Sequence, residues 1–341
     1  MNHQWINFSK GFLILLVVIG HVAGVGRSLE MDPLESVCGF VYRCIYAFHM
    51  PAFFVIAGWC WRPYDAKSYF CTKFKRLLIP YFIFGVFSST IYALVYGFPS
   101  WYHPLISLIH GGKWPSGEGF RCNSVLWFLP CMFSILSIYW IIEKILKCKL
   151  GMFILMVVCF VLNVQILYSR FFYLPWGLDL VPWYMVFFLC GRILSNILPK
   201  CKFENIGISL FLILMIPLIF YVRETVMSGF SFRGLNALLA ISFTMLIFYA
   251  MQMLPGSFFL WLGELGKSSL GIMLTHKFFV VFLQEKVLCV RNLFKGEWYA
   301  VIFGLIFISV VSVLASYWVT ILIRKFCPWC IGEKYIPINN T

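Results

Sequence analysis

Three histidines, His21, His49 and His276, lie inside apolar stretches long enough to cross a membrane. Ionisable side chains are costly at that depth, and those that occur usually face a partner or a cavity. An imidazole titrates near neutral pH, so it can take a proton from a hydroxyl group as a general base, or briefly carry a transferred group as a nucleophile. A lone membrane histidine more often makes a hydrogen bond between helices. The interpretation therefore depends on what accompanies each histidine.

Lys10 and His21 share one face of the first apolar stretch. They are eleven residues apart, which corresponds to three helical turns with about 20° of drift and a rise of about 16 Å. His49 lies eleven residues before Cys60, where the next predicted loop begins, so its depth matches that of His21. We therefore predict that His21, Lys10 and His49 form a catalytic group. The histidines lack helical spacing to further ligands, so no metal site is predicted.

A basic cluster follows the second apolar stretch. Lys73, Lys75 and Arg76 fall within four residues, in the predicted loop that leads into the third stretch. Such clusters commonly anchor a loop on the cytoplasmic side. Lysine and arginine also bind phosphates by charge and by paired hydrogen bonds. The functional interpretation is an anion site, with coenzyme A supplying the phosphates from the cytosol.

The composition indicates that these residues are positioned by membrane helices. Of the 341 residues, 62% are hydrophobic and 12% are charged, well outside the usual composition of a soluble domain. A spanning helix needs roughly 20 apolar residues. We predict an all-α, polytopic transmembrane bundle of about ten helices, near 8–26, 37–60, 77–97, 124–142, 150–168, 180–198, 206–222, 235–253, 262–284 and 299–323. The Pro- and Gly-rich segment 98–123 is expected to form turns and not a helix.

The distribution of lysine and arginine orients this bundle. With the N-terminus inside, sixteen of them fall on the cytoplasmic side and nine outside, which favours cytoplasmic termini at both ends. The net charge of +14 then reflects topology and attraction to the lipid bilayer, and no nucleic-acid partner is predicted. We expect one membrane domain over 1–326 and a short cytoplasmic tail over 327–341.

Five segments, in order along the chain, resemble motifs of acyltransferase family 3, in particular its fucose 4-O-acetylase-like branch. They are the basic residue and histidine of Lys10–His21, the FHMPAFFVIAGW segment of Phe48–Trp59, Lys73 and Arg76 followed by Pro80, the LWFL of Leu126–Leu129, and Leu265–His276. The chain departs from the pattern at four positions. Lys10 and Lys73 replace the commoner arginines, and Ala57 and Trp59 replace a serine and a phenylalanine.

The resemblance implies an integral-membrane acyltransferase of the bacterial inner membrane. It implies transfer of an acetyl group from cytoplasmic acetyl-CoA to a sugar hydroxyl of a cell-surface polysaccharide, such as an O-antigen or capsule repeat unit on a lipid-linked glycan. His21 is then the catalytic base or a transient acyl carrier, and Lys10 its basic companion. Coenzyme contacts are assigned to Lys73, Lys75 and Arg76, and substrate contacts to Tyr46, Trp127 and His276.

Two other functions remain open at this level. A transporter or flippase for a lipid-linked sugar or anionic solute also needs many helices, a polar midplane and basic loops. An acyltransferase for succinyl or another acyl group would carry the same motifs. The pair Cys327 and Cys330 is compatible with a redox pair, with half of a metal site, or with no role.

Overall fold

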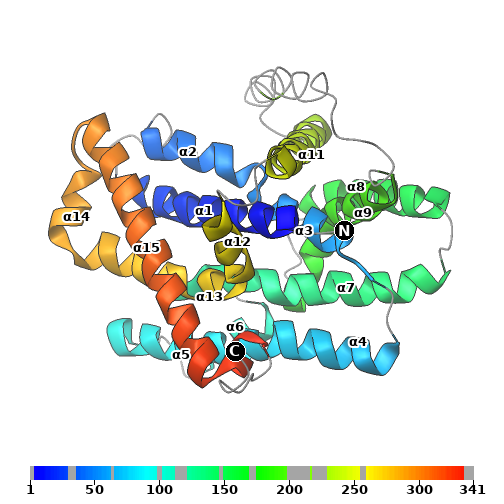
Figure 1. Ribbon diagram of the computed structural model, residues 1–341, viewed down its shortest axis with the longest axis horizontal. Helices are drawn as coiled ribbons and strands as arrows, with labels where there is room; N and C mark the ends of the chain where they lie inside the picture. The colour runs from blue at the N-terminus through cyan, green and yellow to red at the C-terminus, as the bar shows by residue number, and fades with distance from the viewer. Residues whose placement is uncertain are drawn as a thin grey trace.

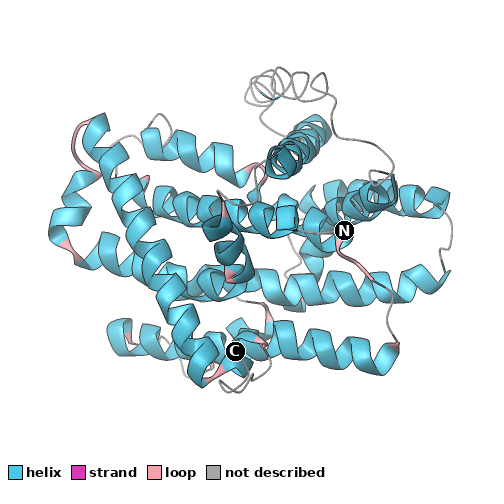
Figure 2. Ribbon diagram, viewed as in Figure 1, coloured by secondary structure: helices cyan, strands magenta, loops and turns pink. Residues whose placement is uncertain are grey.

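A computed structural model describes residues 4–29, 36–62, 65–97, 102–111, 121–145, 149–168, 174–197, 216, 229–253 and 259–333. Every regular element in these ranges is a helix, and none of the described residues forms a strand (Figure 2). The predicted all-α class is confirmed.

Among the described residues, seven helical segments are long and apolar enough to cross a membrane. They are Gln4–Gly26, Val37–Trp59, Ala66–Leu94, Asn123–Ile145, Pro175–Asn196, Gly234–Met253 and Trp298–Phe326. The chain is thus a multi-pass membrane protein. The expected span at 150–168 contains a shorter apolar segment, Leu150–Asn163, and that at 206–222 lies outside the described residues apart from residue 216. The total of about ten helices and the side of each terminus stay predictions.

Helix α1 (Gln4–Gly26) lies at the centre of the bundle (Figure 1). It packs against α2 (Val37–Tyr46), α3 (His49–Trp59), α11 (Gly229–Met253), α12 (Leu260–Lys267), α13 (Ser269–Val281) and α15 (Trp298–Phe326). The outer elements are α4 (Ala66–Lys73), α5 (Ile79–Tyr96), α6 (His103–Ile109), η2 (Arg121–Trp127), α7 (Phe128–Ile145), α8 (Lys149–Tyr168), η3 (Pro175–Leu180), α9 (Val181–Ile197), η5 (Phe282–Lys286), α14 (Leu288–Leu293) and η6 (Pro328–Ile331). Residues on the inner faces of six helices therefore surround α1.

Two of the predicted helices are broken beside α1. The stretch 37–60 divides into α2 and α3 because Pro51 has no N–H to donate to the carbonyl of Ala47, and its ring crowds that carbonyl. Phe48, at the break, has φ −138° and ψ −23°. The stretch 262–284, predicted as one helix, divides at Ser268 (φ −91°, ψ 2°) into α12 and α13. Freed backbone groups at such breaks must find other partners inside a membrane protein.

Two expectations about loops are wrong. The cations at positions 73–76 do not lie in a loop, because α4, the π-helical turn η1 (Phe74–Leu78) and α5 follow one another directly. The tighter or wider turns inserted into α-helices often mark functional positions. The segment 98–123 contains the short helix α6, whose first turn includes Pro104, a residue that suits a helix start.

Reciprocal glycines allow two helix pairs to approach closely. A Cβ atom on Gly11 or Gly266 would collide with the backbone of α12 or α1, and one on Gly58 or Gly191 with the backbone of α9 or α3. Small residues of this kind are typical of contacts between membrane helices. These two crossings fix α12 and α3 against their neighbours, and α3 carries His49.

Candidate active site

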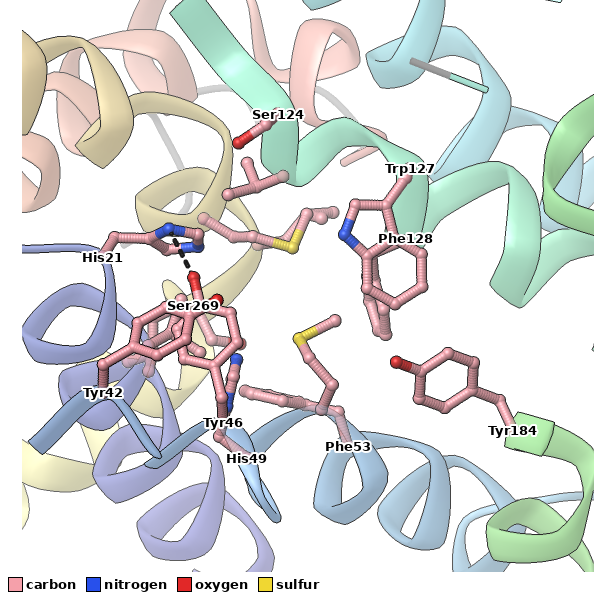
Figure 3. Close-up of a pocket in the computed structure, with 16 residues that line it drawn as sticks. His21, Tyr42, Tyr46, His49, Phe53, Ser124, Trp127, Phe128, Tyr184 and Ser269 are labelled. Carbon is pink, nitrogen blue, oxygen red and sulfur yellow. Dashed lines mark hydrogen bonds between the residues drawn. The ribbon is translucent and has the colours of Figure 1, made fainter. Parts of the chain in front are cut away.

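A cavity of about 520 Å³ lies beside α1. It is bounded by α1, α2, α3, η2, α7, α9 and α13, and Figure 3 shows the side chains that face it. The lining residues are Ile14, Val17, His21, Tyr42, Tyr46, His49, Met50, Phe53, Ser124, Val125, Trp127, Phe128, Tyr184, Ser269, Leu270 and Met273. None of these described lining residues is a lysine, arginine, aspartate or glutamate. The cavity is therefore polar through hydroxyl, indole and imidazole groups alone.

His21 is held at this cavity by Tyr46 from the end of α2. The Tyr46 hydroxyl lies 3.0 Å from His21 Nδ1 (Figure 3). When Nδ1 carries the hydrogen it donates to the tyrosine oxygen, and Nε2 is left with a lone pair. Tyr42 stacks on Tyr46 at 3.8 Å between ring centroids, and the Arg27 guanidinium lies 4.2 Å from the Tyr42 ring centroid. This stack fixes the tyrosine that orients the imidazole, the arrangement a general base needs.

The other two histidines are fixed by their own helices. His49 Nδ1 is 2.8 Å from the carbonyl oxygen of Ile45, a bond that crosses the break between α2 and α3. His276 Nδ1 is 2.9 Å from the carbonyl oxygen of Ile272. A carbonyl only accepts, so each Nδ1 carries the hydrogen and each Nε2 a lone pair. His49 lines the cavity together with His21.

Positive charges gather where α1 begins. Lys10, Arg62 and Lys73 surround Cys60: burial raises the pKa of the Cys60 thiol, and these three charges oppose the shift. Lys75 and Arg76 continue this group along η1 with exposed side chains. We call these five cations the basic edge. Lys10 thus belongs to the basic edge and, at eleven residues or about 16 Å along the helix from His21, does not reach the imidazole.

Comparison with protein families identifies the kind of protein to which this cavity belongs. The family model described as an acyltransferase domain, that of acyltransferase family 3, matches residues 3–321. The chain belongs to acyltransferase family 3. No curated protein and no solved structure matches it. A member of acyltransferase family 3 transfers acyl groups, so this chain is a membrane acyltransferase.

The acyltransferase closes its basic edge with a C-terminal strap, Cys327–Glu333. Arg324 pairs with Glu333 at 2.8 Å and also donates to Ser268 Oγ at 2.7 Å, at the break between α12 and α13. The backbone of Gly332 lies against Arg76 so closely that a Cβ atom would be 2.5 Å from Arg76 Cα. The strap therefore joins η1 to the helix break.

Within the strap, Cys327 and Cys330 sit side by side. The Cys330 amide donates to the Cys327 carbonyl at 2.9 Å. Burial raises the pKa of the Cys330 thiol, and the neighbouring Cys327 adds to the shift. No group of three histidine, cysteine, aspartate or glutamate side chains in the described residues is arranged to hold a metal ion.

Some of the predicted site residues line the cavity of the acyltransferase, and others do not. His21, His49, Tyr46 and Trp127 line it, whereas Lys10, Lys73, Lys75 and Arg76 form the basic edge. His276 does not line it and instead contacts the His21 ring, at 5.2 Å between centroids. Tyr184 and Ser269 face the cavity without having been predicted. Tyr184 belongs to an aromatic-rich span, and nothing in its local sequence distinguishes it.

Proposed function

We propose that this acyltransferase moves an acetyl group from acetyl-CoA to a sugar hydroxyl of a bacterial cell-surface glycan, at the inner membrane. The observation that carries the proposal is His21, oriented by Tyr46 at 3.0 Å on the wall of a cavity with no charged lining residue in the described chain. Nε2 of His21 takes the hydroxyl proton as the oxygen attacks the thioester carbonyl. The carbon–sulfur bond then breaks, and the proton passes to the coenzyme sulfur. The alternative route places the acetyl group on His21 first.

The donor is assigned to the side of the basic edge. Along α1 the cavity runs from His21 to Ile14, and Lys10 follows one helical turn further on. The distance from Lys10 to His21 is about 16 Å along the helix, which suits a coenzyme whose phosphates contact cations while its thioester reaches the histidine. Lys73 and Arg76 lie close enough to interact electrostatically, so two charges can share one phosphate region. On this assignment the phosphates stay outside the cavity.

The uncharged lining favours acetyl over succinyl. A succinyl group ends in a carboxylate, and burying an ion without a partner carries a large desolvation cost. None of the described residues that line the cavity offers a cation to it. An acetyl group brings no such charge. The same reasoning favours an acceptor whose reacting sugar ring is neutral.

Aromatic side chains support the assignment of a sugar as acceptor. Trp127 and Tyr184 face each other across 5.3 Å between ring centroids, and Figure 3 shows the indole nitrogen and the tyrosine hydroxyl directed toward the cavity. Flat rings with a polar edge present both an apolar face and hydrogen bonds to a ligand. The resemblance to the fucose 4-O-acetylase-like branch points the same way. A lipid-linked glycan would meet the site from the membrane.

The test compares surface glycans from cells with the wild-type protein, without the protein, and with His21→Ala. The proposal expects an O-acetyl signal in the NMR spectrum of the wild-type glycan alone, at matched protein levels. Trp5→Phe, on α1 but outside the cavity, serves as a control for changes to the helix. An O-acetyl signal that persisted with His21→Ala would contradict the catalytic role of His21. A signal with a different acyl group would reject acetyl.

A further inference from the structure

His276 is a fully buried imidazole with one nitrogen unused. Its side chain has 0% exposure, and its Nδ1 hydrogen is bound by the Ile272 carbonyl at 2.9 Å. Nε2 therefore holds a lone pair, and it has no hydrogen-bond partner among the described residues. A buried acceptor left unpaired carries a desolvation penalty. Such a group is a candidate for a role that appears only during the reaction.

The ring of His276 lies beside the ring of His21, the proposed catalytic base. The two rings are 5.2 Å apart between centroids and inclined at 42°. The titratable groups around His21 are Tyr46 from α2, His49 from α3, and His276 with Lys277 from α13. No described carboxylate is among them. In the part of the chain that the structure describes, His21 therefore has no acidic partner of the kind that usually stabilises a histidine base after it takes a proton.

We infer that Nε2 of His276 faces His21 and supplies that stabilisation in place of a carboxylate. The inference rests on the proposed function. The Ile272 bond holds the positive end of the imidazole dipole at Nδ1, so the negative end lies at Nε2. When His21 takes the hydroxyl proton, this negative end lowers the energy of the imidazolium. His276 gains and loses no proton, and the proton leaves His21 for the coenzyme sulfur. His276 is thus a positioning residue and not a substrate contact.

Two variants separate this electrostatic role from packing. His276→Gln keeps an acceptor oxygen near the position of Nε2, whereas His276→Leu keeps bulk and removes the acceptor. Each purified protein is reconstituted and assayed for transfer from acetyl-CoA to the unacetylated glycan. We expect kcat to fall about 100-fold with His276→Leu, the lower range for removing one preorganised electrostatic stabiliser of the transition state, with KM for both substrates unchanged. His276→Gln should stay within about tenfold of wild type, because its side-chain oxygen restores the negative end of a dipole near His21.

The pH profile of kcat gives a second reading. Without the acceptor, protonated His21 is disfavoured, so the acidic limb of the profile should move to lower pH in His276→Leu and return with His276→Gln. Equal losses in kcat for both variants, with an unmoved pH limb, would assign His276 to packing and overturn the inference. A wild-type kcat in His276→Leu would overturn it as well.

The wild-type protein itself provides a test that needs no variant to fold. In ¹⁵N-histidine NMR, the inference expects His276 to keep hydrogen on Nδ1 and a bare Nε2 across the pH range in which His21 titrates. A His276 that took up a proton with His21 would overturn it. If the wild-type protein acetylated no glycan, the proposed acetyltransferase function itself would be rejected. That result differs from a titrating His276, which would reject only the role inferred for His276.

Discussion

Around His21 the polar side chains are buried or half-buried and individually held, whereas at the basic edge they are largely exposed. His49 is 1% exposed and His276 0%, and each imidazole is held by a hydrogen bond of 2.8–3.0 Å. Lys75 and Arg76 are exposed on η1, and Lys73 is half-buried. A site that depends on geometry tolerates small displacements poorly. A site that depends on summed charge loses only part of its affinity with each charge that is removed. Chemistry and donor binding should therefore respond differently to mutation.

The largest effect is expected where backbone contacts hold the cavity wall. Gly58→Ala places a Cβ atom against the carbonyl of Phe188 and separates α3, with His49, from α9. Overpacking of this kind costs about 1–3 kcal/mol, so the thermal unfolding midpoint and the transfer activity should both fall. Gly234→Ala is the matched control, because a Cβ atom there meets nothing within 4 Å. Equal unfolding midpoints for the two variants would contradict the close α3–α9 crossing.

The next effect concerns the donor alone. Lys73→Ala combined with Arg76→Ala should raise KM for acetyl-CoA about 30-fold, since two phosphate contacts at ~1 kcal/mol each are removed. The turnover number should change little. Lys144→Ala also removes a cation, one that lies 3.6 Å over the Trp140 ring, and should leave KM unaltered. Added salt should raise the wild-type KM and reduce the difference. A fall in kcat with constant KM would place these cations in the chemistry.

A smaller effect tests how much the orientation of the His21 imidazole contributes to kcat. Tyr46→Phe removes the 3.0 Å contact with His21 and keeps the ring stacked on Tyr42. One net hydrogen bond of ~1 kcal/mol corresponds to a loss in kcat of roughly 5- to 10-fold. Tyr81→Phe removes a buried hydroxyl that donates to the Leu108 carbonyl and should leave kcat near wild type. Steady-state rates at saturating donor decide the comparison, and equal rates for both variants would deny Tyr46 its role.

The smallest effect is expected at the strap. Gly332 has φ +70° and lies against Arg76, so Gly332→Ala adds both strain and a collision. Displacement of the strap should raise KM for acetyl-CoA at most about fivefold, the factor that corresponds to ~1 kcal/mol of backbone strain. Gly97→Ala shares the positive φ, +76°, but has open surroundings and should not change KM. An identical change in KM for both variants would show that the strap does not contribute to donor binding.

The sequence predicted the helical class, because helical rise and hydropathy depend on local spacing alone. The common depth predicted for His21 and His49 stays a prediction; the two side chains line one cavity although the helix that carries His49 is broken. Pro51 offered a signal for that break that the hydropathy reading passed over. The break at Ser268 had no such local signal, and Arg324, which donates to the Ser268 hydroxyl, comes from a distant helix.

Contacts between distant segments could not be predicted from the sequence. The His21–His276 contact joins residues from opposite ends of the chain, and hydropathy cannot tell which faces of two helices meet. The glycine crossings were missed for the same reason: Gly58 and Gly191 matter only because α3 and α9 are neighbours. The position of Lys10 among the basic edge followed from its place on α1, but its distance from His21 excludes direct contact at the reacting atoms.

The central claim is that His21 performs the chemistry while the basic edge binds the donor. The most direct test measures both properties on one protein, purified His21→Ala, by titrating it with acetyl-CoA and then assaying transfer to the glycan acceptor. The account predicts a dissociation constant within about twofold of wild type, because truncating a group that acts only in the transition state leaves ground-state binding unchanged, together with no detectable transfer. Transfer at a wild-type rate, or loss of acetyl-CoA binding by the folded variant, would contradict it.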